Sequence, residues 1–328
     1  MRSLVVLLFV ALSGHAQIPV GTDALLARLV AGKTLPEKLL STRSVAFYPH
    51  TMTTKELEKA QESFARSGID VVLYLDSDLL AAGRDPSVAL AQYLNGREIE
   101  SLLIFRKRNS QYSLYVVPYN RMADFFPEGQ VSWYAEHVRL DPLLHQLYLA
   151  TNSAGLKRTN MLINESPELA MPVNIFRRNR SEFFAIDLKV DPLAAPLFGN
   201  PVMDSALVDI MKMYPYKLKF TDSGLAEGQI RRDGSYYVLR FIYARARLAY
   251  QLMGYGNAPG GNAIVSVAWN GDNPELNSIA DDAYVYKFYF KHIDSGNIFL
   301  GTKWDADESW EQALINQLKA FRAELRIN

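Results

Sequence analysis

Cysteine is missing from all 328 residues of the sequence. Its absence excludes disulfide bonds, thiolate zinc sites, iron–sulfur clusters and a cysteine nucleophile. An excess of positive charge is missing too, because 35 basic side chains balance 35 acidic ones. A general nucleic-acid binder needs such an excess to displace the counterions of phosphates, so we expect no nucleic-acid partner. The Gly-x-Ser-x-Gly elbow of serine hydrolases and the His-Glu-x-x-His helix of zinc enzymes are also absent, and we expect no metal and no cofactor.

Long apolar runs are scarce, and the one at the start of the chain is too short to cross a membrane. It extends from Leu4 to Leu12, about half of the roughly 20 residues that the hydrocarbon core requires. The short basic start before it and the small residues around Ala16 after it predict a signal peptide over residues 1–16. We therefore expect an exported bacterial protein, periplasmic or secreted, with no transmembrane segment once the signal is removed. A chain of this size and composition is long enough for about two domains.

The hydrophobic pattern predicts an α/β fold of two small mixed-sheet modules in tandem, 17–198 and 199–328. In the first module, the capping-box sequence Thr53 to Glu56 starts a helix that Gly68 ends. β-Branched and aromatic runs at 44–48 and 71–75 flank this helix, which is the pattern of a βαβ unit. Further elements are expected as a helix from Asp85, a hairpin of strands 102–105 and 114–117, and a closing helix over 133–150 that would carry both His137 and His145.

The second module, 199–328, is expected to contain an aromatic β-hairpin and a terminal helix. Aromatic residues alternate along 284–290, and we expect this face to pack beneath the last helix, against Trp310 and Phe321. Asp305 and Asp307 are expected to cap that helix. The other expected elements are helices 206–213 and 245–253, strands 217–220, 237–243 and 264–269, a polar loop holding Asp272, Glu275, Asp281 and Asp282, and a hairpin of 283–292 with 298–303.

Between the modules we expect a hairpin over 175–186 and a linker over 191–201. The hairpin tip carries Arg177, Arg178 and Arg180, which are candidates for binding a phosphate or an acidic partner. Charge at a hairpin also protects a sheet edge from aggregation, which is the ordinary explanation. The prolines and glycine of 191–201 argue against regular structure there.

One group of polar residues has the position of an active site. Open α/β sheets bind ligands beyond the carboxyl ends of their strands, and His50, Asp76 and Asp78 follow the two strands of the βαβ unit. His50 would act as a general base, with Asp76 and Asp78 either orienting it or holding a divalent cation through their oxygen atoms. The alternative is that all three residues are ordinary polar residues of surface turns.

The order helix, strand, helix, strand, strand over residues 55–119 resembles the TPM domain family, which is found in exported or membrane-tethered bacterial and plastid proteins. The segments that carry the resemblance are 67–75, 102–105 and 114–117. The family usually has a glycine-led strand after its second helix, whereas this chain has Glu100 and Ser101 there. Some members are associated with phosphatase activity, but no specific motif matches and no catalytic residue is transferred.

Three functions fit these features. The first is an exported, non-enzymatic protein that contacts another protein or a component of the cell envelope. The second is a hydrolase, for example of the phosphatase type, with its site at His50, Asp76 and Asp78. The third is a small-ligand binding protein whose site lies between the modules, with the 191–201 linker as a hinge.

Overall fold

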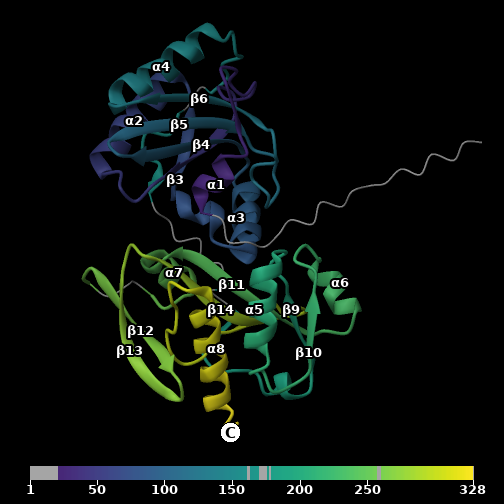
Figure 1. The fold of residues 1–328 in the computed structure, drawn as a ribbon. Coiled ribbons are helices and arrows are strands. Elements are labelled where there is room, and N and C mark those ends of the chain that lie inside the picture. Colours follow the sequence, from purple (N-terminus) through teal and green to yellow (C-terminus); the bar gives the residue numbers. More distant parts are fainter. Residues whose placement is uncertain (1–20, 161–162, 170–175, 177–178, 257–259, 328) are drawn as a thin grey trace, which may run out of the picture.

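The computed structural model describes residues 21–160, 163–169, 176, 179–256 and 260–327. The predicted signal peptide, 1–16, therefore lies outside the described residues. Two mixed β-sheets with helices around them make the chain an α/β protein, as predicted (Figure 1). We call residues 21–169 the N-terminal half and residues 179–327 the C-terminal half, since each contributes one of the large sheets. None of the described helices is long and apolar enough to cross a membrane.

The N-terminal half is built on a seven-stranded sheet in the order β1-β6-β5-β4-β2-β3-β7. Its centre is parallel, since β2 pairs with both β3 and β4, and the predicted hairpin adds β5 and then β6 in antiparallel fashion. The strands are β1 (Val30–Gly32), β2 (Arg43–Tyr48), β3 (Asp70–Asp76), β4 (Ile99–Arg108), β5 (Gln111–Pro118), β6 (Val131–His137) and β7 (Glu168–Leu169).

Helices cover both faces of this first sheet. On one face α2 and α4 bury apolar side chains such as Phe64 and Leu147 against the sheet, and on the other α1 and α3 do the same. The predicted capping box of α2 is present, and Gly68 ends the helix in the left-handed region with φ +83°. The helices are α1 (Thr22–Leu26), α2 (Thr54–Ser67), α3 (Arg84–Gly96), α4 (Leu140–Ser153) and the short 3₁₀ turn η1 (Ser77–Ala81).

The C-terminal half is built on a six-stranded sheet in the order β10-β9-β11-β14-β15-β8. A separate two-stranded hairpin, β12–β13, lies beside it at the left of the lower part of Figure 1. The strands are β8 (Arg180–Ser181), β9 (Leu193–Pro196), β10 (Leu218–Thr221), β11 (Tyr237–Arg245), β12 (Ala263–Asn270), β13 (Asn273–Ala280), β14 (Tyr284–His292) and β15 (Ile298–Phe299).

The aromatic face of β14 packs as the sequence predicts. Phe288 and Phe290 are buried in one cluster with Trp310 and Phe321 of the terminal helix α8. Helix α5 packs on this same face, whereas α6 and α7 lie on the opposite one. The helices are η2 (Ile186–Lys189), α5 (Pro201–Met211), α6 (Glu227–Arg232), α7 (Ala246–Leu252) and α8 (Trp310–Glu324).

The predicted linker and hairpin between the modules are wrong where the structure describes them. Residues 193–196 of the expected linker form β9, which is fully buried between β10 and β11. The prolines are tolerated because Pro196 is the last residue of this short strand. Of the expected 175–186 hairpin, the described residues 180–181 form β8, which pairs in parallel with β15. Residues that belong to the second sheet therefore begin before residue 198.

Three further sequence predictions are corrected. The expected closing helix over 133–150 is divided, since 131–137 form β6 and the helix α4 begins at Leu140; His137 and His145 therefore lie on different elements. The expected polar loop at 272–282 is mostly the strand β13, which shows little alternation of apolar and polar residues because all of its residues except Ile279 are exposed. Helix α8 is capped by Ser309, whose hydroxyl accepts the N–H of Gln312, and Asp305 lies elsewhere.

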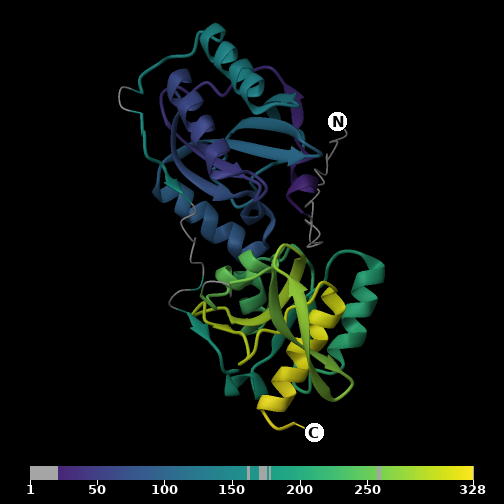
Figure 2. The same ribbon diagram turned by 90° about the vertical axis from the view of Figure 1, so that its left-hand side faces the viewer.

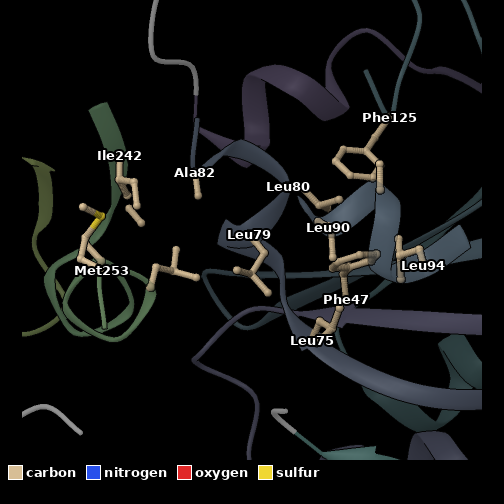
Figure 3. Packing of buried hydrophobic residues seen from close by; sticks show 14 of the residues in the cluster. Phe47, Leu75, Leu79, Leu80, Ala82, Leu90, Leu94, Phe125, Ile242 and Met253 are labelled. Atoms are coloured by element: carbon tan, nitrogen blue, oxygen red, sulfur yellow. The ribbon is translucent and has the colours of Figure 1, made fainter. Parts of the chain in front are cut away.

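A hydrophobic cluster continues from one half of the chain into the other. Leu79 and Ala82 of the N-terminal half lie between their own core and the side chains of Ile242 and Met253, as Figure 3 shows. The backbone takes part, because the Tyr243 N–H donates to the Ala82 carbonyl over 3.1 Å. The halves are stacked end to end through this contact in both ribbon views (Figures 1 and 2).

Glycine is required at position 83 for this close approach. Its φ of +122° disfavours any residue with a side chain, and a Cβ placed there would lie 2.8 Å from the carbonyl oxygen of Phe241. The strand β11 therefore packs directly on the backbone of the N-terminal half, and this contact places the carboxyl ends of the first sheet against the second.

Candidate functional site

The two predicted aspartates lie where the sequence analysis placed them, at the carboxyl end of β3. Asp76 is the last residue of the strand, and its Oδ1 accepts the N–H of Asp78 over 3.0 Å, which caps η1. The short capped turn aims both carboxylates beyond the sheet edge. This is the edge at which α/β proteins usually bind ligands.

A side chain from the other half of the chain occupies that edge. Arg245, the last residue of β11, donates from Nε to Asp78 Oδ2 over 2.5 Å and from Nη2 to Asp76. Tyr284 donates its hydroxyl to Asp78 Oδ1 over 2.8 Å. Side-chain exposure is only 6% for Arg245 and 8% for Asp78, against 23% for Asp76. The carboxylates therefore form a buried salt bridge between the halves.

The charges at this contact perturb one another. Burial raises the pKa of Asp76, and the Arg245 guanidinium opposes that rise. Burial lowers the pKa of Arg245, but the two carboxylates outweigh it and leave that pKa above its usual value. Burial together with the charge of Asp78 raises the pKa of Tyr284. The arrangement thus favours a charged arginine held by carboxylates and a neutral tyrosine.

The third predicted residue, His50, does not join this network. It is exposed in the turn after β2, and within the described residues no hydrogen bond or ion pair links it to Asp76 or Asp78. Among β2 residues, Tyr48 is the one whose pKa responds to this site, since burial and then the charge of Asp76 raise it. The structure therefore brings together the two aspartates but not the proposed base.

A second charged cluster, which the sequence analysis missed, lies across the same contact. Lys291 of β14 donates to Asp85 Oδ1 over 2.8 Å and pairs with Glu227 Oε2 over 3.0 Å. The Tyr289 hydroxyl donates to Asp85 Oδ2 over 2.7 Å, and Arg240 pairs with Glu227 over 3.0 Å. The sequence of β14 contained a sign of this cluster. Its second face carries lysines, and because the strand is central in its sheet, those lysines are covered by other elements and need charged partners.

The predicted binding arginines are only partly described. Arg177 and Arg178 lie outside the described residues. Arg180 is mostly buried: its Nε donates to the Met253 carbonyl over 2.9 Å, and its guanidinium stacks 4.6 Å from the centre of the Tyr255 ring. These contacts attach β8 to the end of α7, so Arg180 holds the C-terminal half together.

Asp305 has a different role from the helix cap that the sequence suggested. It is fully buried with Lys287, whose Nζ lies 2.6 Å from Asp305 Oδ1 and also donates to the Leu300 carbonyl and to Gln317. Burial raises the pKa of Asp305 and lowers that of Lys287, while each charge counteracts the shift of the other. No set of three metal-ligating side chains occurs in the part of the chain that the structure describes.

A surface cavity of about 420 Å³ lies at the opposite end of the first sheet. Arg43 and Asp70, the first residues of β2 and β3, line it together with Arg97. Arg97 forms a bidentate ion pair with Glu168, with both distances 2.8 Å. The charges that line the cavity are balanced. The cavity faces away from the contact between the halves, and it was at that contact that the sequence analysis expected a ligand.

Comparison with protein-family models and with curated proteins finds no match for this chain. The resemblance to the TPM domain family thus remains a prediction.

Proposed function

We propose that the chain is an exported, non-enzymatic protein that acts by contact with another protein. The main support for the proposal is that Arg245 and Tyr284 occupy the strand-end edge, by which we mean the carboxyl ends of the strands of the first sheet. This is the edge at which α/β proteins usually bind their substrates. Both carboxyl oxygens of Asp78 are used in these contacts, and the more exposed carboxylate of Asp76 also pairs with Arg245, so a substrate that bound either carboxylate would compete with Arg245.

Opening the contact to admit a substrate would be costly. The salt bridge would be lost, and the buried side chains of Leu79, Ile242 and Met253 would be exposed to water. Each such side chain contributes about 1.5–3 kcal/mol when fully buried. Because separating the halves costs this much free energy, the two sheets should keep a fixed orientation. They would then present their outer surfaces to a partner.

Catalysis is tested with the purified chain from residue 17 onward. We expect no hydrolysis of p-nitrophenyl phosphate or p-nitrophenyl acetate above the buffer blank, with or without Mg²⁺, Mn²⁺, Zn²⁺ or Ca²⁺. Asp78→Asn is the informative variant, and Asp281→Asn is its control because the Asp281 carboxylate pairs with Arg247 and not with Arg245. Turnover that Asp78→Asn abolishes and Asp281→Asn retains would establish the hydrolase instead.

Export is tested with the full chain produced in a bacterial host and separated into cytoplasmic, envelope and culture fractions. Intact-mass measurement should find the processed chain beginning at Gln17 outside the cytoplasm. Accumulation of the uncleaved chain in the cytoplasm would overturn this part of the proposal.

A further inference from the structure

The hairpin β12–β13 has an apolar face that the described residues cover only in part. Val265 and Leu276 are 58% and 78% exposed on this face. They share it because Val265 lies opposite Ser278 and Leu276 opposite Val267, and residues paired across strands point to one side. The opposite face is anchored, with Ile264 and Ile279 buried in the core. The outer face is therefore held firmly and presents apolar side chains to solvent.

The outer edge of β13 is also open. The N–H groups of Val267 and Trp269 point away from β13, since they donate to the Trp304 carbonyl over 2.8 Å and to Asn316 Oδ1 over 2.9 Å. In an antiparallel ladder, residues directly opposite such a position also point their backbone groups outward. By the register these are Pro274, Leu276, Ser278 and Ala280.

Only part of that edge is protected. Pro274 has no N–H to offer, and the Ala280 carbonyl accepts the N–H of Ala283 over 3.1 Å. Leu276 and Ser278 remain, and no strand among the described residues pairs with β13 on this side. Exposed edges usually carry lysines or are covered, because unpaired backbone groups attract another strand. This one offers backbone pairing beside an apolar face.

The charges around the edge are acidic. Asp272 is neutralised by Lys319 and Asp281 by Arg247, but Glu275 and Asp282 carry no ion pair in the described chain. A second copy of the chain fits poorly here. Antiparallel pairing of two β13 edges would bring Glu275 and Asp282 of both copies to one seam, where their like charges repel.

We propose that the outer edge of β13 binds an extended segment of a different polypeptide, one with apolar side chains at alternate positions and basic residues at its ends. Backbone hydrogen bonds to Leu276 and Ser278 supply the pairing, and the apolar face of the hairpin receives the alternating side chains. The basic residues complement Glu275 and Asp282. This inference rests on the proposed protein-binding function and names the surface that performs it.

The test uses two fluorescein-labelled eight-residue peptides in which valine alternates with threonine, one with lysine ends and one with glutamate ends. Binding is followed by fluorescence anisotropy. Ser278→Pro removes an outward N–H and blocks the edge while leaving the ladder to β12, and Leu276→Lys places a charge on the apolar face. Each variant should weaken binding of the lysine-ended peptide at least tenfold. Leu149→Lys, at another exposed leucine, in α4, is the matched control and should leave it unchanged.

Hydrogen exchange supplies the second measurement. The lysine-ended peptide should slow exchange of the Leu276 and Ser278 amides, and the Glu275→Lys variant, which leaves Asp282 unchanged, should remove the preference for the lysine-ended peptide. Failure of the lysine-ended peptide to bind the unaltered chain at about 1 mM would overturn the proposal, as would equal binding by Ser278→Pro. A dimer of the unaltered chain that Ser278→Pro dissolves would identify a second copy as the occupant and also overturn it.

The outcomes separate this inference from the proposed function. Absence of both peptide binding and ester hydrolysis would remove the β13 surface but leave a non-enzymatic protein. Peptide binding together with hydrolysis that Asp78→Asn abolishes would keep the surface and remove the non-enzymatic function.

Discussion

Removing the guanidinium of Arg245 should strongly destabilise the protein. In Arg245→Met, the carboxylates of Asp76 and Asp78 would remain at the contact without their buried countercharge. Removing one partner of a buried salt bridge typically costs about 3–5 kcal/mol, whereas an exposed pair contributes about 0–1 kcal/mol. Because water reaches part of Asp76, we expect a loss of about 3 kcal/mol in the free energy of unfolding.

The loss should also depend on pH. Burial raises the pKa of Asp76 even with Arg245 present, and without the guanidinium that pKa rises further. A carboxyl group with a raised pKa in the folded state binds its proton more tightly there than in the unfolded chain. The folded state of the variant is therefore relatively more stable at low pH, and its deficit from the unaltered chain should shrink as the pH falls from neutral into the acidic range.

Urea unfolding followed by tryptophan fluorescence measures both effects. Arg247→Met is the matched control, because this neighbouring arginine is exposed in its ion pair with Asp281 and should cost less than about 1 kcal/mol. Adding Asp76→Asn and Asp78→Asn to Arg245→Met should recover about half of the loss, since the remaining groups are then uncharged. Equal costs for the two arginine variants, or a deficit that does not change with pH, would refute the reasoning.

Two further predictions concern the N-terminal half. Glu56 is mostly buried; burial raises its pKa, but hydrogen bonds from Lys107, Thr53 and Tyr112 outweigh that and lower the pKa to about 2. Glu56→Gln should therefore cost about 1–2 kcal/mol near neutral pH, and urea titrations should show this difference disappearing as the pH falls from about 4.5 to about 2; a constant difference would contradict it. Gly83→Ala should lower the free energy of unfolding by about 1–3 kcal/mol more than Gly129→Ala in the same assay. Both glycines have a positive φ, but only at Gly83 would an added Cβ lie against backbone atoms. Equal losses would show that the halves are not in close contact there.

Local sequence signals predicted the elements whose cause is local. The Thr53 capping box and Gly68 define α2 by hydrogen bonds within a few residues, and the flanking apolar runs define β2 and β3. The errors occurred where distant partners decide the structure. Residues 193–196 were expected to be irregular because of their prolines, but β10 and β11 bury them as a strand. Neither neighbour is close in sequence, so composition alone could not indicate the pairing.

The candidate site was predicted in part for the same reason. The βαβ pattern placed Asp76 and Asp78 at a sheet edge, because the end of a strand is a local property. The arginine that pairs with them is 167 residues from Asp78 along the chain. Arg245 itself gave no sign of this role, since it stood at an expected boundary between strand and helix. The sequence therefore located the acidic half of the salt bridge and left its partner unidentified.

Strands usually place apolar residues on their buried face and polar residues on their exposed face. Strand β14 and the hairpin β12–β13 depart from this pattern in opposite ways, and each departure indicates a contact with a partner. The second face of β14 carries lysine in a central strand, and Lys291 there finds Asp85 of the N-terminal half. The outer face of the hairpin carries Val265 and Leu276 where polar residues are expected. A buried charge requires a partner because desolvation is expensive, and an exposed apolar strand with an open edge tends to acquire one. The first partner is within the chain, and the same reasoning applied to β13 leads to a second polypeptide.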